Sequence, residues 1–236
     1  MTVNILPTHI PTVNPKRQRF RRPWQSDPSC VLNLMPEINT QWRDYSGHNN
    51  HATLVGPTRV HNGRFGEALL FDGVNDAATI THSAELSLPT EVTVECWTNA
   101  SAMGGAGIRP ILRKTSNVWA YNDYNYGLGI IDDGVTWVHG DGVGHDTLGV
   151  INILDGNWHH ILGGFDAVNH HVIIDKVRTT AANTRVPLVN VNDLEISFNN
   201  AGNLFAGILD TIRIYNKMLT DSEISNLYEQ GKPSEV

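Results

Sequence analysis

Short apolar runs alternate with polar turns along most of the chain between residues 31 and 216. The runs are rich in β-branched and aromatic residues and are short for helices, a pattern typical of β-strands. VTVECWT (92–98) is the densest run and suits a strand packed on both faces. Gly, Asn and Asp fill the intervening turns. The pattern predicts an all-β domain. The predicted strands cover residues 31–36, 52–56, 67–73, 77–82, 92–98, 108–114, 126–132, 135–140, 158–166, 170–176, 194–199 and 207–216.

Two hairpins and one helix are also signalled. The turns at residues 132–134 and 166–169 each separate two apolar runs and predict tight hairpins. Residues 220–231 predict a short helix at the end of the domain. Thr220, followed three positions later by Glu223, has the spacing of a capping box, in which each residue hydrogen-bonds the backbone N–H of the other.

The first 30 residues differ from the rest in pattern and in charge. They contain five prolines and no apolar periodicity, which predicts an extended arm without a core of its own. Residues 1–30 carry a net charge of +4 and the whole chain carries −7, so residues 31–236 carry −11. We expect an arm over residues 1–30 and one sandwich over residues 31–236, with the arm binding neighbouring protein subunits of an assembly. A solvated tail is the alternative, and one basic cluster is a weak basis for nucleic acid binding. The residues expected to bind the partner are Lys16, Arg17, Arg19, Arg21, Arg22 and Trp24.

Length and composition suit a single large domain with a substantial core. No apolar run is long enough to span a bilayer. Residues 1–15 are broken by three prolines and lack the apolar segment of a secretory signal. If Met1 is the true start, we expect synthesis in the cytoplasm and a place on the surface of a virion or another extracellular particle. Cys30 and Cys96 suit small buried thiols, and a disulfide between them stays open.

Five motifs in a fixed order carry a resemblance to a known family. They are DYSGHNNHATL (44–54), FGEALLFDGVND (65–76), VTVECWT (92–98), GNWHHILGGFD (156–166) and FAGILDTIRIYNKMLTDSEISNLY (205–228). With these motifs the chain resembles the laminin-G-like, concanavalin-A-like lectin-glucanase family over residues 31–230. The resemblance implies a jelly-roll β-sandwich with an extended N-terminal arm and a short C-terminal helix. It implies no single activity, because this sandwich serves as lectin, adhesin, glycosidase accessory domain and virion component.

Signatures of catalysis are missing from the sequence. Glycoside hydrolysis needs two carboxyl groups aimed at one bond, which lytic members of this superfold place on one strand face as E-x-D-x-(x)-E. Asp193 and Glu195 have part of this spacing, but Ser197 follows them, so we expect a solvated edge. No G-x-S-x-G elbow and no P-loop occurs. We therefore expect a protein that is not an enzyme.

Adjacent histidines raise a zinc hypothesis. His159-His160 and His170-His171 lie on strands expected to pair as a hairpin. Neighbouring side chains point to opposite faces of a strand, so at most one ring from each strand can meet its counterpart, which is half a zinc site. The resemblance instead makes Trp158 and His159 packing residues.

Calcium is the better metal candidate. The loop from Asp44 to Asn50 offers carboxylate, amide and hydroxyl oxygens, which are the ligands that calcium prefers. The resemblance places Asp210 close to this loop, and Asp72 and Asp76 are further oxygen donors. A structural calcium ion held by Asp44, Asn50 and Asp210 is the prediction, and a turn closed by its own hydrogen bonds is the alternative.

An aromatic cluster suggests a ligand surface. Residues 116–127 combine Trp119, Tyr121, Tyr124 and Tyr126 with Gly and Asn. Aromatic faces and nearby amides suit the C–H surfaces and hydroxyl groups of a carbohydrate. The alternative is that alternate rings face the core.

Two functions therefore compete. The leading hypothesis is a non-enzymatic structural or decoration protein of a multi-subunit assembly, such as a phage or virus particle, attached to neighbouring subunits through its arm. The absence of catalytic acids and the opposite charges of arm and body favour it. The alternative is a carbohydrate-binding, lectin-like module, free or accessory to a glycan-active enzyme.

Overall fold

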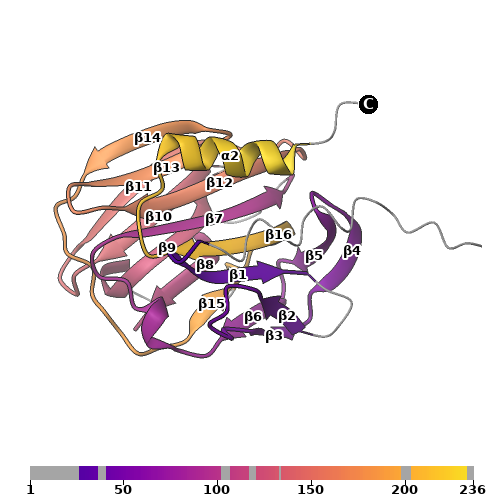
Figure 1. Cartoon of the computed structure of the whole chain (residues 1–236), viewed down its shortest axis with the longest axis horizontal. Coiled ribbons are helices and arrows are strands. Elements are labelled where there is room, and N and C mark those ends of the chain that lie inside the picture. Colours follow the sequence, from indigo (N-terminus) through magenta and orange to yellow (C-terminus); the bar gives the residue numbers. More distant parts are fainter. Residues whose placement is uncertain are drawn as a thin grey trace, which may run out of the picture.

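A computed structural model of the chain describes residues 27–36, 41–101, 107–116, 121–132, 134–197 and 203–232. Within these residues the chain forms a β-sandwich with one short α-helix, the concanavalin-A-like jelly roll that the sequence predicts (Figure 1). The strands form two antiparallel sheets, which are continuous at one corner where β2 pairs with β1.

Sheet A carries the helix on its outer face. Its strands are, in order, β14 (Val177–Ala182), β13 (Asn169–Ile174), β12 (Trp158–Phe165), β7 (Val92–Asn99), β16 (Ala206–Tyr215) and β1 (Cys30–Met35), with β5 (Gly66–Asp72) also on β16 and β4 (Thr58–Gly63) on β5.

Sheet B lies opposite. Its strands are, in order, β11 (His145–Asn152), β10 (Gly134–Gly140), β9 (Tyr124–Ile131), β8 (Arg109–Thr115), β15 (Leu194–Ile196), β6 (Ala77–Ile80), β3 (Ala52–Val55) and β2 (Gln41–Asp44). Two single turns of 3₁₀-helix, η2 (Ala84–Leu86) and η3 (Tyr121–Asp123), lie in its connections.

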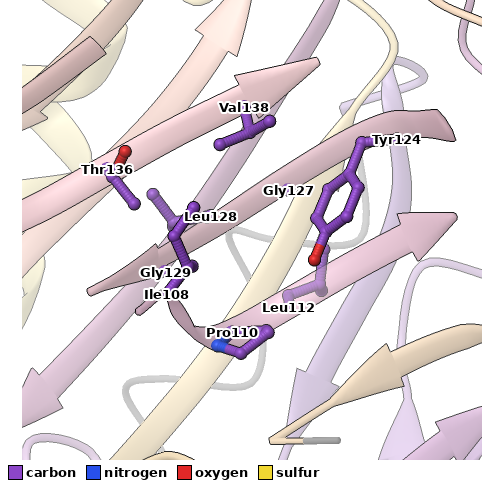
Figure 2. Close-up of a pocket in the computed structure, with 9 residues that line it drawn as sticks. All are labelled: Ile108, Pro110, Leu112, Tyr124, Gly127, Leu128, Gly129, Thr136 and Val138. Atoms are coloured by element: carbon purple, nitrogen blue, oxygen red, sulfur yellow. The ribbon is translucent and has the colours of Figure 1, made fainter. Parts of the chain in front are cut away.

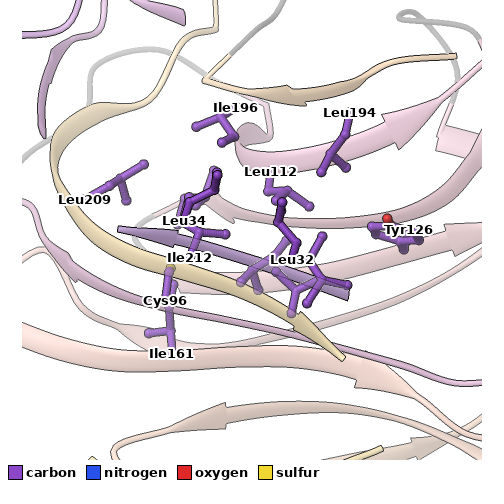
Figure 3. Close-up of a cluster of buried hydrophobic side chains, with 14 of the residues drawn as sticks. Leu32, Leu34, Cys96, Leu112, Tyr126, Ile161, Leu194, Ile196, Leu209 and Ile212 are labelled. Carbon is purple, nitrogen blue, oxygen red and sulfur yellow. The ribbon is translucent and has the colours of Figure 1, made fainter. Parts of the chain in front are cut away.

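The hydrophobic core fills the space between the sheets (Figure 3). Alternate residues of the central strands point into it, as the period of a β-strand requires. Large and small side chains match across the gap. Trp137 of β10 lies against Gly163 of β12, where an added Cβ atom would come within 2.3 Å of the indole ring. The two sheets can therefore approach closely only because residue 163 has no side chain.

A second apolar cluster lies between sheet A and helix α2 (Asp221–Gly231). Ile224 and Leu227 of the helix pack on Leu162, Ile173 and Tyr215 of the sheet. As a result, β7 is buried on both faces, which confirms the sequence prediction for residues 92–98.

The local signals for the helix and the hairpins are also confirmed. The Thr220 hydroxyl accepts a hydrogen bond from the backbone N–H of Glu223, whose side chain accepts one from the Thr220 N–H, so the capping box is complete. β9 pairs antiparallel with β10 and β12 with β13, as the two predicted hairpins require.

Some elements differ from the sequence prediction. The polar strands β4 and β14 were not expected, because they are largely exposed and lack the apolar alternation of core strands. Asp193 is exposed as expected, but the expected sheet edge at Glu195 is wrong, because β15 lies inside sheet B between β6 and β8. Cys30 and Cys96 are buried free thiols. Across the described ranges, no helix has the length and apolar character that crossing a membrane requires.

Candidate functional site

Part of the predicted aromatic cluster belongs to the core. Tyr126 is fully buried, its ring is parallel to that of Trp137 at 6.4 Å, and its hydroxyl donates a 2.9 Å hydrogen bond to the Leu86 carbonyl. The prediction that Tyr126 contacts a ligand is therefore wrong. Trp119 and the arm residues lie outside the described residues. The arm residues are Lys16, Arg17, Arg19, Arg21, Arg22 and Trp24.

Tyr124 lies on the outer face of sheet B and is largely buried. Its ring covers Gly127, where an added Cβ atom would lie 2.7 Å from two ring carbons. Burial raises the pKa of the Tyr124 hydroxyl, which also hydrogen-bonds Arg113. Arg113 in turn forms a 2.7 Å ion pair with Glu195. Tyr124 therefore packs beneath the surface of sheet B, and little of its ring is available to a ligand.

A narrow crevice without room for a water molecule lies beside Tyr124 on β8, β9 and β10 (Figure 2). Its lining contains no charged side chain, so it offers no acid, base or metal ligand. The lining residues are Ile108, Pro110, Leu112, Tyr124, Gly127, Leu128, Gly129, Thr136 and Val138.

Tyr121, by contrast, is an exposed ring next to polar groups. It is 38% exposed and meets the rings of Tyr124 and His145 edge-on, at 5.9 and 5.6 Å between centroids. Beside it, the Asn122 side-chain oxygen lies 2.8 Å from Nδ1 of His145, and the Asn122 amide donates to the Val143 carbonyl at 3.0 Å. These contacts fix an aromatic face next to an amide and an imidazole.

The turn between β10 and β11 completes this region. The Asp141 carboxylate accepts hydrogen bonds from the backbone N–H groups of Val143 and Gly144, and the Arg185 guanidinium lies 3.0 Å from it. These contacts lower the pKa of Asp141 to about 2, with the Gly144 and Val143 N–H groups as the largest causes. We call Tyr121, Asn122, Asp141, His145 and Arg185 the Tyr121 surface.

The chemistry available at the Tyr121 surface is that of binding. An aromatic ring, an amide, an imidazole and an ion pair can stack on and hydrogen-bond a polar ligand. Asp141 stays ionised at neutral pH and is held by backbone donors, so it is a poor general acid. The sequence offered one signal for this region, the glycine-rich turn after His139, which reads GDGVGHD from residue 140 to residue 146. It did not reveal that Arg185 and Asn122 meet that turn.

The residues expected to bind calcium form hydrogen bonds with other groups of the protein. The Asp44 carboxylate accepts hydrogen bonds from the backbone N–H groups of Asn33, Ser46 and Asn50. The Asp210 carboxylate accepts one from the Phe65 N–H, and burial raises its pKa to about 6. In the described part of the chain, no three His, Cys, Asp or Glu side chains form a group that could hold a metal ion. Calcium binding stays a prediction.

Asp72 and Asp76 also act within their own turn. The Asp72 carboxylate accepts hydrogen bonds from the Val74 and Asn75 N–H groups, and that of Asp76 accepts one from the Asp72 N–H. Both side chains therefore close the turn after β5.

The histidine pairs do not meet. His170 and His171 pair with Phe165 and Gly164, at the end of the hairpin remote from His159 and His160. The cross-strand zinc arrangement is therefore wrong. His160, rather than His159, is the packed member of its pair.

The surroundings of the two neighbouring rings explain this difference. The His160 ring stacks on Trp97 at 4.9 Å and its Nε2 atom lies 2.8 Å from the Glu95 carboxylate. The His159 ring lies between the carboxylates of Asp155 and Asp175 on the partly exposed face.

Comparison with known proteins gives one family and many similar folds. The family model Laminin_G_3, described as the concanavalin A-like lectin/glucanases superfamily, matches residues 72–225. No curated protein matches the chain.

Three solved structures illustrate the similar folds. The binding domain of Paraclostridial Mosquitocidal Protein 1 is 15% identical, with a TM-score of 0.71 over 85% of this chain and 52% of that one. The binding domain of botulinum neurotoxin DC, solved with rat synaptotagmin II, is 14% identical, with a TM-score of 0.70 over 86% and 52%. The structure of botulinum neurotoxin type C, whose cell entry depends on interaction with two ganglioside molecules, is 15% identical, with a TM-score of 0.70 over 87% of this chain and 52% of that one. The chain thus spans about half the length of these structures, and the likeness concerns the fold.

Proposed function

We propose that this chain, which belongs to the concanavalin A-like lectin/glucanases superfamily, is a non-catalytic binding domain that recognises a carbohydrate at the Tyr121 surface. The exposed Tyr121 ring, held beside Asn122 and His145, is the observation that carries the proposal. A tyrosine ring offers an apolar face to sugar C–H groups at a low cost in side-chain entropy. The amide, the imidazole and the Asp141–Arg185 pair offer donors and acceptors for hydroxyl groups.

The similar structures support a binding role over a role in particle assembly. They come from clostridial toxins, one of which depends on two ganglioside molecules for cell entry, while the binding domain of another was solved with rat synaptotagmin II. This favours the lectin-like interpretation over that of a phage or virus decoration protein. At 14–15% identity the similarity does not carry over the ligand itself.

A glycan array with the purified chain tests the proposal. We expect saccharide-specific signals that Tyr121→Ala reduces at least about ten-fold, because hot-spot aromatic residues contribute about 2 kcal/mol or more to binding. Tyr45→Ala is the matched control, since Tyr45 is also a partly exposed tyrosine but lies beside Arg43 at the end of β2. An array without signal, or equal binding by wild type and Tyr121→Ala, would overturn the proposal.

A further inference from the structure

Two buried histidines face each other between the sheets, next to the Tyr121 surface. His139 comes from β10 and His170 from β13, and their ring centroids are 5.5 Å apart at an interplanar angle of 74°. Both side chains are almost fully buried. No described residue gives the His170 Nε2 atom a hydrogen-bond partner. An imidazole pair of this kind is unusual in a core that is otherwise apolar.

The hydrogen bonds of His139 show that its ring is neutral. The Trp137 indole N–H donates to Nδ1 of His139 at 3.2 Å, so this nitrogen must be an acceptor. The proton therefore sits on Nε2, which lies 3.4 Å from the Asp146 carboxylate. A second proton on Nδ1 would place two donors against each other and break the bond to Trp137.

The same carboxylate holds a short segment of the chain that we call the strap, residues 183–185. Asp146 Oδ2 accepts hydrogen bonds from the backbone N–H groups of Thr184 and Arg185, at 2.7 and 3.0 Å. Asn183, the first residue of the strap, lies with its side-chain oxygen 3.1 Å from Nδ1 of His170. Both histidines therefore touch the groups that hold the strap.

The strap leads directly to the Tyr121 surface. The Arg185 side chain reaches Asp141 and packs over Gly144, where an added Cβ atom would lie 2.5 Å from the guanidinium. Asp141 closes the turn whose Val143 carbonyl accepts from Asn122. A displacement of the strap would therefore alter the ion pair and the turn on which the Tyr121 ring depends.

We propose that the His139–His170 pair is an acid-sensitive latch on the strap, so that acidification loosens residues 183–185 and weakens ligand binding at the Tyr121 surface. When His139 takes up a proton, its charged Nε2–H competes for Asp146 with the Thr184 and Arg185 N–H groups. The hydrogen bond from Trp137 is lost at the same time.

The other groups around His139 allow this response. Burial lowers the pKa of His139 to about 4, with the neighbouring His170 acting in the same direction and Asp146 opposing it. Burial alone would raise the pKa of Asp146, but its hydrogen bonds with Thr184 lower it, so the carboxylate stays charged while His139 titrates. Phe165 covers the remaining side of the His139 ring and carries no charge.

The charged groups near His170 are not in contact with His139. Its neighbour His171 contacts Asp166 and feels the positive charge of Arg178, while burial lowers the pKa of His171. These groups act at the far side of β13 from His139, so the latch can be tested separately from them.

Amide hydrogen exchange of the full chain at about pH 7.5 and about pH 3.5, below the folded pKa of His139, tests the latch without any ligand once corrected for intrinsic exchange rates. We expect protection of the Thr184 and Arg185 amides to fall at least about ten-fold at the lower pH relative to amides of β7. His139→Gln should abolish this change, because glutamine can accept from Trp137 and donate to Asp146 but does not titrate. His61→Gln is the control, since the His61 side chain is 83% exposed.

The hydrogen-exchange results can contradict the latch in two ways. If strap protection does not depend on pH, or if His139→Gln keeps the dependence, the latch is wrong. Should His139→Gln fail to fold, NMR titration of the wild-type His139 ring decides, because loss of strap protection must follow its protonation.

The effect on binding rests on the proposed function and has its own readout. The glycan array repeated at about pH 3.5, where His139 is mostly protonated in the folded state, should give weaker signals for wild type and unchanged signals for His139→Gln. An array without signal at either pH contradicts the proposed function, whereas unchanged strap protection contradicts the latch.

Discussion

Glu95 and Arg213 face each other on the neighbouring strands β7 and β16, with Nη1 of Arg213 2.8 Å from both carboxylate oxygens of Glu95. Both side chains are essentially inaccessible to solvent, beneath helix α2 and the β4–β5 hairpin. Burial alone would raise the pKa of Glu95, but Arg213 and His160 outweigh it and the pKa is lowered. The acid is therefore charged and paired within an apolar layer.

Removing one partner of this pair should be far more damaging than removing both. Glu95→Gln leaves Arg213 charged and buried, and we expect a loss of about 3–5 kcal/mol in the free energy of unfolding, measured by urea denaturation. The double variant Glu95→Gln with Arg213→Met should recover part of it. The exposed pair Lys176–Glu229 is the control, and Glu229→Gln should leave the free energy of unfolding nearly unchanged, because solvent screens this pair. Equal costs at the two sites would contradict this view of the buried pair.

Gly163 should not tolerate even a methyl group. Gly163→Ala places a Cβ atom 2.3 Å from the Trp137 ring and 2.9 Å from Leu128, so we expect a loss of about 1–3 kcal/mol or more through overpacking. Gly149→Ala is a matched strand control, because the nearest atom to its Cβ position is 4.0 Å away. Thermal denaturation of both variants checks the prediction, which fails if they melt alike.

Stability should fall with acid in a way that depends on His139. Its folded pKa of about 4 lies below its ordinary value of 6.5, so the unfolded state binds more protons and stability is lost as pH falls through this window. The expected loss between about pH 7.5 and about pH 5 is on the order of 2 kcal/mol. Asp210 has the opposite slope, since its raised pKa means that the folded state takes up the proton first.

The contribution of His139 must therefore be measured as a difference. Urea denaturation of wild type and His139→Gln at both pH values isolates it, because Asp210 is common to the two proteins. If the two proteins lose the same stability on acidification, His139 is not the cause.

The sequence of the loop from Asp44 to Asn50 has two explanations, a calcium site or a turn closed by its own hydrogen bonds. If the loop is closed by its own hydrogen bonds, Asp44→Asn should cost about 1–3 kcal/mol and a chelator should leave the wild-type Tm unchanged. If calcium is bound, the chelator should lower the wild-type Tm but not that of Asp44→Asn. The wild-type melting curve with and without chelator therefore decides between the ion and the turn.

The parts of the fold that sequence could predict are those with local physical signals. The capping box at Thr220 and the turn at residues 166–169 depend on neighbours within a few positions, and both are present. The exposed strand β14 gave no signal, because its residues do not alternate between a core and solvent.

The Tyr121 surface could not be predicted from local sequence patterns, because its residues meet only in the folded chain. Tyr121 and Tyr126 look alike in the sequence, but Tyr121 lies in the 3₁₀ turn η3 at the surface, whereas Tyr126 lies on β9 and points into the core. Arg185 reaches Asp141 across 44 positions of the chain. Such contacts follow from the topology of the sandwich, which the family resemblance predicts only in outline.

The position of β16 also has a consequence for synthesis. This strand is hydrogen-bonded to β1, β5 and β7, yet it follows all three in the chain and leaves the ribosome after them. Until residues 206–215 emerge, the early strands lack the central partner that completes sheet A. Their apolar faces and free edges are then open to wrong pairing, which is the usual route to aggregation. The nascent chain should therefore need protection until β16 has emerged, and slower translation of the strands before it would not help them to fold.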